Sequence, residues 1–304
     1  MLVDFKLSRD GRTLVLTRGR QMGAGSAPDG WDVLDTASGR LRATVQPAEF
    51  STWYPWWINP DATRLHQPVV TLTMADTAPK PLHLVAYDLI TGKEAGRLTL
   101  PHILVGTWRP GAVVNGDPVI QEQYPALALS PGGDALLIYQ PDPAMLTVVD
   151  AARLEVTRVV TGARTAGALA ALVLPFLPQI ASAKATEGTN LQAVAAPDGR
   201  SLYVWGNVNH LAAGGSPVYG SVGLQRINLQ NGAVAATALP DARLFAVLVA
   251  PDGRSVYTYA AESNTAILDS PDWPALLRRH DATTLAITAS RECTGYRQLL
   301  ARLR

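Results

Sequence analysis

The chain has 304 residues, of which 47% are hydrophobic and 17% are charged, and its formal net charge is +1. This length and apolar content are enough to bury a large core, which excludes disorder as the default state. The small net charge excludes a sequence-wide attraction to nucleic acid or to an anionic membrane. The single cysteine, Cys293, excludes an intramolecular disulfide.

A hairpin signature recurs five times along the chain. Each copy has an apolar strand, a turn of Pro, Asp and Gly residues, and a second strand rich in β-branched and aromatic residues, which is the pattern of a β-hairpin. The copies read "LSRDGRTLVLT" from Leu7, "INPDATRLHQPVV" from Ile58, "LALSPGGDALLIY" from Leu127, "AAPDGRSLYVWG" from Ala195 and "VAPDGRSVYTYA" from Val249. We expect the acidic residues of these turns to hydrogen-bond the turn backbone and to take no part in acid–base chemistry. They are Asp10, Asp61, Asp198 and Asp252.

A second signature follows each hairpin and indicates a third strand, a turn at Asp or Asn and Gly, and a fourth strand. It reads "VLDTASGRLRATV" from Val33, "AYDLITGKEAGRL" from Ala86, "VVDAARLEVTRVV" from Val148, "RINLQNGAVAATA" from Arg226 and "RHDATTLAITASR" from Arg279. Four antiparallel strands repeated in this way predict an all-β chain folded as a β-propeller of four-stranded antiparallel blades. Stacking the blades around an axis buries the apolar faces that each sheet alone would expose.

Five blades in one propeller domain are predicted, followed by a short amphipathic C-terminal helix. The predicted blades cover about residues 1–47, 48–101, 124–161, 190–240 and 241–293, and the helix covers 294–304. Six or seven blades are the alternative, if degenerate blades lie in residues 101–124 and 161–190.

The repeat resembles the YVTN and WD40-like bacterial propeller repeats over nearly the whole chain. The resemblance rests on Pro-Asp-Gly-Arg-x-Leu/Val-Tyr followed by Asp-x-x-Thr-Gly, as in "PDGRSLY" from Pro197 and "DLITG" from Asp88. It implies a bacterial propeller and leaves the function open, because similar propellers include lactonases, amine dehydrogenase subunits, peptidase-associated domains and scaffolds.

Four long segments are expected as loops on the face opposite the short turns. They are residues 19–30, 101–123, 161–189 and 207–221. Insertions gathered on one face of a repeat protein are typical of a binding surface. The aromatic residues of "FSTWYPWWINP" would hold a sugar or peptide there by stacking, or would pack between blades. The candidate ligand- or partner-binding residues are Trp53, Tyr54, Trp56, Trp57, His102, Trp108, Arg109, Asp117, Glu122, His210 and Tyr219.

Motifs for catalysis, metal binding or cofactor binding are absent from the sequence. The five histidines show no HxH, HxxxH or HExxH spacing, and no Walker A loop or G-x-S-x-G elbow occurs. The segment "GAGSAPDG" from Gly23 fails the dinucleotide fingerprint, because Pro28 stands where the third glycine should be. We therefore assign no catalytic residue and expect no metal and no cofactor.

The interpretation we favour is a non-catalytic module that binds a partner protein, a peptide or a small ligand on its loop-rich face. The alternatives are a hydrolase or lactonase-type enzyme with its site at the mouth of the central channel, and an extracytoplasmic sugar or cell-wall binder. The N-terminal "MLVDFKLSRDG" has no signal-peptide pattern, which predicts a cytoplasmic protein, or an extracytoplasmic one if the N-terminus has been trimmed. The apolar residues 166–183 contain Pro175 and Pro178, so we expect a loop with a short buried helix and no membrane span.

Overall fold

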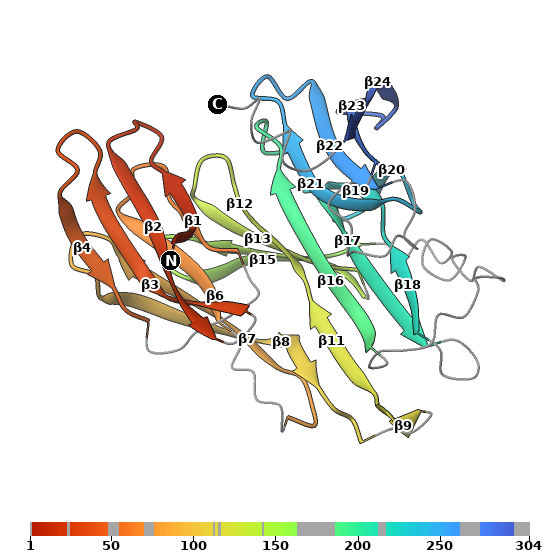
Figure 1. Ribbon diagram of the computed structural model, residues 1–304, viewed down its shortest axis with the longest axis horizontal. Helices are drawn as coiled ribbons and strands as arrows, with labels where there is room; N and C mark the ends of the chain where they lie inside the picture. Colours follow the sequence, from red (N-terminus) through yellow and green to blue (C-terminus); the bar gives the residue numbers. More distant parts are fainter. Residues whose placement is uncertain are drawn as a thin grey trace. The chain divides into compact units, whose positions relative to one another are not determined.

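The described part of the chain is built of β-strands alone (Figure 1). The computed structural model describes residues 2–22, 25–47, 55–69, 76–111, 113–114, 117–141, 143–162, 186–211, 217–261 and 274–294. Within these ranges no helix is long and apolar enough to cross a membrane. The predicted helix in 166–183 and residues 295–304 of the predicted C-terminal helix lie outside the described ranges, while Thr294 ends a strand.

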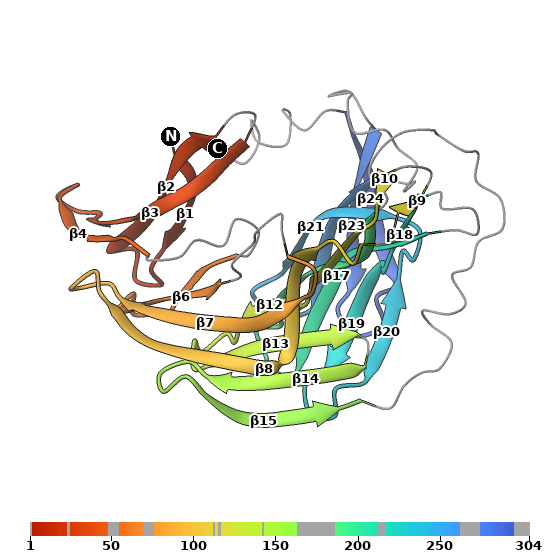
Figure 2. The same cartoon turned by 90° about the horizontal axis from the view of Figure 1, so that it is seen from below.

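Five groups of four neighbouring strands follow one another along the chain, and we number them blades 1 to 5. Blades 1, 3 and 5 are complete four-stranded sheets. In each blade the strands lie side by side in the order in which they occur in the sequence, as the strands of blade 3 do in Figure 2. Blade 1 has β1 (Leu2–Leu7), β2 (Thr13–Met22), β3 (Gly25–Asp35) and β4 (Leu41–Val45). Blade 2 has β5 (Trp57–Ile58), β6 (Arg64–Val69), β7 (Lys80–Asp88) and β8 (Glu94–Trp108). Blade 3 has β12 (Ala126–Leu129), β13 (Ala135–Pro141), β14 (Ala144–Asp150) and β15 (Glu155–Thr161).

Blades 4 and 5 complete the series. Blade 4 has β16 (Thr186–Ala195), β17 (Ser201–Leu211), β19 (Leu224–Asn228) and β20 (Val234–Ala238), and blade 5 has β21 (Arg243–Val249), β22 (Ser255–Ala261), β23 (Pro274–Asp281) and β24 (Ile287–Thr294). The prediction of an all-β chain of four-stranded antiparallel blades is confirmed. The chain divides into two compact units, Met1–Trp108 with Gly132–Leu136 and Val148–Arg158, and Arg109–Pro131 with Leu137–Thr147 and Val159–Arg304.

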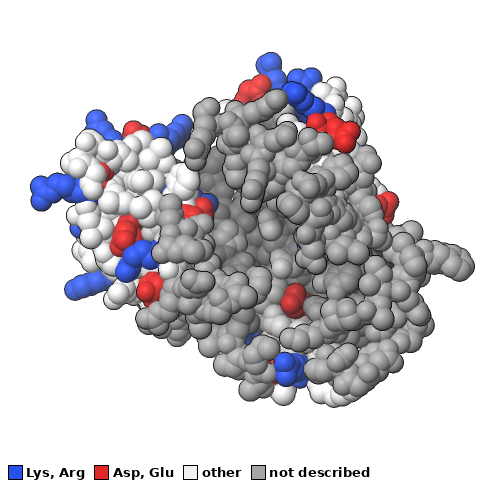
Figure 3. All heavy atoms as spheres, viewed as in Figure 1, with Lys and Arg blue, Asp and Glu red and all other residues white. Residues whose placement is uncertain are grey.

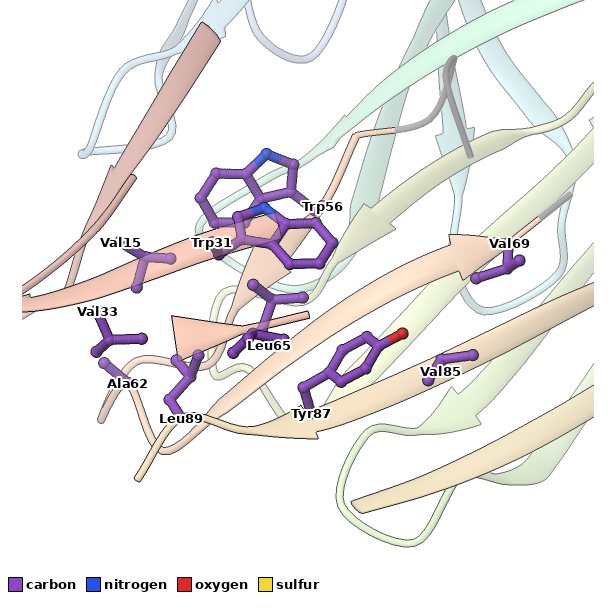
Figure 4. Close-up of a cluster of buried hydrophobic side chains, with 11 residues drawn as sticks. Val15, Trp31, Val33, Trp56, Ala62, Leu65, Val69, Val85, Tyr87 and Leu89 are labelled. Atoms are coloured by element: carbon purple, nitrogen blue, oxygen red, sulfur yellow. The ribbon is translucent and has the colours of Figure 1, made fainter. Parts of the chain in front are cut away.

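The core of the first unit lies between blades 1 and 2 and is centred on Trp31. The ring of Trp31 lies 6.0 Å from that of Trp56 and 5.9 Å from that of Tyr87, measured between ring centroids. Figure 4 shows these rings beside Leu65, with aliphatic side chains of both blades around them. Trp56 is only 6% exposed, so this candidate binding residue is part of the packing between blades.

The core of the second unit lies between blades 4 and 5. Tyr203 and Trp205 of blade 4 pack in one cluster with Val256 and Leu285 of blade 5. The Tyr203 hydroxyl also donates a hydrogen bond of 2.8 Å to the carbonyl oxygen of Ala282. Both interblade cores therefore consist of side chains from facing sheets, as the stacking of blades requires.

The acidic residues of the first turns bind the turn backbone, as predicted. The Asp10 carboxylate accepts a hydrogen bond of 3.0 Å from the backbone N–H of Arg12, and the same bond forms at Asp198 and Asp252. Hydrogen bonds from the Ser8 hydroxyl and the Arg12 backbone lower the pKa of Asp10. The Asp10 carboxylate is thus held ionised by its turn.

The turn between the third and fourth strands has the same hydrogen bonds in all five blades. A backbone N–H donates to the carbonyl oxygen of the Asp or Asn four residues earlier at 2.8 or 2.9 Å, and the donor residue has a positive φ of 56° to 74°. The donors are Gly39, Gly92, Leu154, Gly232 and Leu285. Two of these positions hold leucine, although the left-handed region favours glycine. Both leucines are buried, and burial offsets the backbone strain.

Gly92 and Gly39 give a matched test of this turn, because they occupy equivalent positions in blades 2 and 1. A Cβ atom on Gly92 would lie 2.3 Å from the Thr44 carbonyl oxygen, whereas a Cβ on Gly39 would meet no atom within 4 Å. Gly39→Ala should lower the free energy of unfolding by about 1–2 kcal/mol through left-handed strain alone. Gly92→Ala should lower it by more than about 3 kcal/mol, because the backbone of β4 must also shift. Urea unfolding of both variants measures the difference, and equal losses would contradict the close packing of this turn on blade 1.

Two histidines are buried between strands as neutral side chains. The Nδ1 atom of His66 is buried without a hydrogen-bond partner among the described residues, and burial, assisted by the Arg64 charge, lowers the His66 pKa to about 4. His280 is held by the Thr258 hydroxyl and the Leu285 carbonyl oxygen, each at 3.0 Å, and burial lowers its pKa. The folded pKa of His66 lies below its unfolded value of 6.5. The stabilisation linked to the neutral imidazole is therefore fully present above pH 6.5, and it is lost as the pH falls towards 4.

Replacing His66 should weaken this pH dependence. In His66→Leu the melting temperature should fall less between about pH 7.5 and about pH 5 than in the wild type, since no buried imidazole has to take up a proton. Leucine is a conservative choice because the equivalent position in blade 3 is Leu137. His83→Gln, which removes a half-exposed imidazole of the adjacent strand, is the control and should leave the slope unchanged. If His66→Leu kept the wild-type slope, His66 would not be the buried proton acceptor.

The described parts of three segments expected as loops include extensions of the blade strands. Residues 19–22 and 25–30 continue the pairing of β2 with β3, and Leu104 and Val105 continue that of β8 with β7. In blade 4, β17 runs on to Leu211 and pairs with an additional strand, β18 (Pro217–Ser221). The expectation of loops is therefore wrong for these parts. Continued pairing satisfies backbone N–H and C=O groups that a loop would leave to water.

Candidate functional site

Blade 4 is widened by two strands at the end away from its Pro-Asp-Gly turn. β11 (Ile120–Tyr124) pairs in parallel with the first half of β16, and β18 pairs with the second half of β17 (Figure 1). The order β11, β16, β17, β18 forms a continuous sheet in this region. We call this region the extended end of blade 4.

One cross-strand row of the extended end joins Glu122, Gly188 and Asn209. Glu122 is opposite Gly188, and Gly188 is opposite Asn209. Residues directly opposite each other in a sheet share a face. Because neighbouring strands lie about 4.8 Å apart, the Glu122 and Asn209 backbones are separated by roughly 10 Å.

Gly188 ensures that no side chain stands between Glu122 and Asn209. Its φ is +131°, and a Cβ atom built on it would lie 1.6 Å from the carbonyl oxygen of Glu122. Only glycine fits so close an approach of two backbones. The carboxyl and amide groups therefore flank a strand that is bare at this position.

The adjacent row on the same face is also polar. It runs through Tyr124, Asn190, Asn207 and Ser221 in direct register. The Ser221 hydroxyl donates a hydrogen bond of 2.7 Å to the Ala242 carbonyl oxygen and so anchors this row to the chain that enters blade 5. We call the side chains of Glu122, Tyr124, Asn190, Asn207, Asn209 and Ser221 the polar patch.

Two polar groups of the polar patch are buried or half-buried without a partner that stabilises them among the described residues. Glu122 is half-buried, and burial raises its pKa. The Oδ1 atom of Asn209 is buried and has no hydrogen-bond partner among the described residues. Burying a polar atom without a partner costs about 1–3 kcal/mol, which a ligand's donor would recover.

Charge over the rest of the surface shows no grouping by sign on the face in Figure 3. There the described Lys and Arg residues are interspersed with Asp and Glu. This distribution agrees with the net charge of +1. Within the described ranges, no group of three or more His, Cys, Asp and Glu residues is placed to hold a metal ion.

The other candidate residues of the sequence lie in several places. Trp53 and Tyr54 fall outside the described residues, and Trp57 begins β5 as a half-buried residue. On β8, His102 is exposed and Trp108 is half-buried, as is the following Arg109.

Three candidates lie on the additional strands of the extended end or beside it. Asp117 starts the two-residue strand β10 (Asp117–Pro118), which pairs with β9 (Val113–Val114). His210 is opposite Val218, and Tyr219 is opposite Asn209. The register thus brings two candidates, Glu122 and Tyr219, into one row.

Sequence reasoning missed the asparagines and the glycine that complete this row. A signal was present in "GTN" from Gly188 and "NVN" from Asn207, where polar residues alternate along two strands. The alternation gains its meaning only from the pairing of Asn190 with Asn207 and of Gly188 with Asn209.

Comparisons with known proteins identify the fold. No protein-family model matches the chain, and no curated protein sequence matches it. Among solved structures, it is similar to hydrazine synthase of Kuenenia stuttgartiensis, with a TM-score of 0.52 and 13% identity over 95% of this chain and 65% of that one. It is similar to the Dos1 propeller, with a TM-score of 0.53 and 11% identity over 96% of this chain and 62% of that one. A putative TolB from Agrobacterium tumefaciens matches with a TM-score of 0.48 and 13% identity, over 97% of this chain and 82% of that one.

The similarity to the Dos1 propeller concerns the fold alone. The chain spans 65% and 62% of the length of the first two structures. Together with the five antiparallel blades, the match to a known propeller confirms the predicted fold.

Substituting Gly188 should separate β11 from β16. In Gly188→Ala the added Cβ would overlap the Glu122 backbone, so the backbone amides of residues 120–124 should exchange with deuterium faster than in the wild type. Gly199→Ala is the control, because Gly199 lies in the turn of the same blade at φ +65° with no atom within 4 Å of an added Cβ. Unchanged exchange at 120–124 in Gly188→Ala would show that the pairing tolerates a side chain there.

Proposed function

We propose that this propeller is a non-catalytic binding module and that the polar patch holds a peptide segment of a partner protein. The observation that supports the proposal most directly is the row in which Glu122 and Asn209 flank the bare Gly188. A peptide offers amide donors and acceptors at regular intervals, and asparagine side chains can pair with both. The buried Oδ1 of Asn209 supplies an acceptor that a peptide N–H can satisfy.

The composition of the polar patch favours binding over catalysis. Asparagine amides orient a ligand but neither donate nor take up protons near neutral pH. Three of the six side chains of the patch are asparagines, Asn190, Asn207 and Asn209. This composition supports a recognition surface more than an acid–base pair.

The Glu122 carboxylate indicates which charge the proposed peptide should carry. Glu122 is half-buried, and this burial disfavours the ionised carboxylate and raises its pKa. No Lys or Arg among the described residues forms an ion pair with it. We therefore propose a peptide with a Lys or Arg side chain, whose charge would favour the ionised carboxylate.

The test is selection from a phage-displayed library of random short peptides, followed by calorimetry with the strongest synthetic peptide. Asn209→Ala should weaken binding by about tenfold, because the peptide loses its acceptor. Glu122→Gln should weaken the binding of a peptide that contains Lys or Arg by a similar factor. It should have little effect on the binding of an analogue in which that Lys or Arg is replaced by Met.

Gln230→Ala is the matched control, since Gln230 is an exposed amide at the opposite end of blade 4. It should bind as the wild type does. Equal losses in Gln230→Ala and Asn209→Ala, or a selection that enriches no peptide over an empty support, would overturn the proposal.

A further inference from the structure

Three polar side chains are buried in the interblade core of blades 1 and 2. They are Thr17, Trp31 and Gln67, which are 2%, 1% and 3% exposed. The Thr17 Oγ1, Trp31 Nε1 and Gln67 Oε1 atoms are buried as well, and none of them has a hydrogen-bond partner among the described residues. All three residues belong to the first compact unit.

Strand pairing and ring contacts bring these three side chains to one region of the core. Thr17 is directly opposite Trp31, and residues opposite each other share a face of the sheet. The Trp31 ring contacts the Trp56 ring, as Figure 4 shows. Trp56 directly precedes β5, and the register of β5 with β6 places it beside Gln67. Val85, which is opposite Gln67, is buried in the same cluster as Trp31.

The repeat itself does not require an amide at the Gln67 position. At this position, six residues after the first-turn residue, blades 1, 3 and 4 have the aliphatic residues Leu16, Ile138 and Val204. Blade 5 has Thr258, whose hydroxyl lies 3.0 Å from Nε2 of the buried His280 and is therefore satisfied within the protein. The amide in blade 2 thus differs from its equivalents, because its buried oxygen lacks such a partner among the described residues.

The chemistry of the three groups defines the molecule that fits them. The Trp31 indole N–H can only donate a hydrogen bond, the Gln67 carbonyl oxygen can only accept one, and the Thr17 hydroxyl can do both. A molecule that satisfies all three must therefore accept and donate at once. Closely packed interiors have few spaces larger than a water molecule. Water has both capacities, and a buried water typically makes about three hydrogen bonds to buried polar groups that otherwise lack partners.

We propose that Thr17, Trp31 and Gln67 form an internal water-binding site between blades 1 and 2. The bound water accepts a hydrogen bond from the Trp31 indole N–H and donates to the Gln67 Oε1 and Thr17 Oγ1 atoms. Thr17 and Trp31 belong to blade 1 and Gln67 belongs to blade 2, so the water joins the two blades by hydrogen bonds in addition to their apolar contact. The site goes beyond peptide binding at the polar patch and does not depend on it.

A crystal structure of the full chain at about 1.5 Å resolution tests the proposal, because buried waters that bind several polar groups are well ordered. The wild type should show water density within about 3.2 Å of both the Trp31 Nε1 and the Gln67 Oε1 atoms. Gln67→Leu, which introduces the residue of blade 1 at this position, should lose that density. Gln140→Leu is the matched control and should keep it. Gln140 is 5% exposed, its Oε1 also lacks a partner among the described residues, and it lies on β13 outside this cluster.

Three outcomes would overturn the proposal. The first is direct hydrogen bonding among Thr17, Trp31 and Gln67 in the wild type with no water between them. The second is density for a larger molecule at these atoms, which would make the site one for an organic ligand. The third is full water density in Gln67→Leu. The wild-type structure decides the first two outcomes even if Gln67→Leu fails to fold. Thr17→Val, which keeps the branched shape and removes the hydroxyl, then replaces it and should lower the occupancy of the water.

Discussion

A four-stranded sheet with apolar side chains is stabilised when another sheet covers them, and this constraint shapes both interblade cores. Fully burying a large apolar side chain contributes about 1.5–3 kcal/mol, so Trp31, Leu65 and Tyr87 stabilise blades 1 and 2 only because they meet. The same holds for Tyr203 and Val256 between blades 4 and 5. No blade is an independent unit of stability, which is the property that distinguishes stacked repeats from separate domains.

Close stacking places strict requirements on the turns. Gly92 approaches the Thr44 carbonyl, and Gly133 approaches Pro60 so closely that a Cβ atom would lie 2.1 Å from the proline ring. Asp88 fixes the first of these turns, because its carbonyl oxygen accepts a hydrogen bond from Gly92 and its carboxylate accepts one from the backbone N–H of Thr91. Leu154 shows a second solution, in which a buried side chain fills the space beside Gly96 and offsets a positive φ.

Local features of the fold could be predicted from the sequence, and distant pairings could not. The hairpins around Asp10 and Asp252 are encoded within a dozen residues, because turn chemistry and strand alternation act over short separations. The parallel pairing of Glu122 with Gly188 joins two strands that have no repeat signature in common. The same limit explains Trp56, whose sequence suggested either stacking on a ligand or interblade packing. Only its contact with Trp31 distinguishes the two.

One strand of blade 4, β17, contributes both to the interblade core and to the proposed binding site. On β17, Tyr203 and Trp205 face blade 5 and form part of its core, while Asn207 and Asn209 follow at the same two-residue period. The change from aromatic to amide side chains coincides with the point where pairing passes from β19 to β18. The apolar half needs a covering blade, and the polar half would lose hydrogen bonds if an apolar sheet covered it. Extending the strand beyond the interblade core therefore supplies a rigid platform for polar side chains without weakening the packing that holds the blade in place.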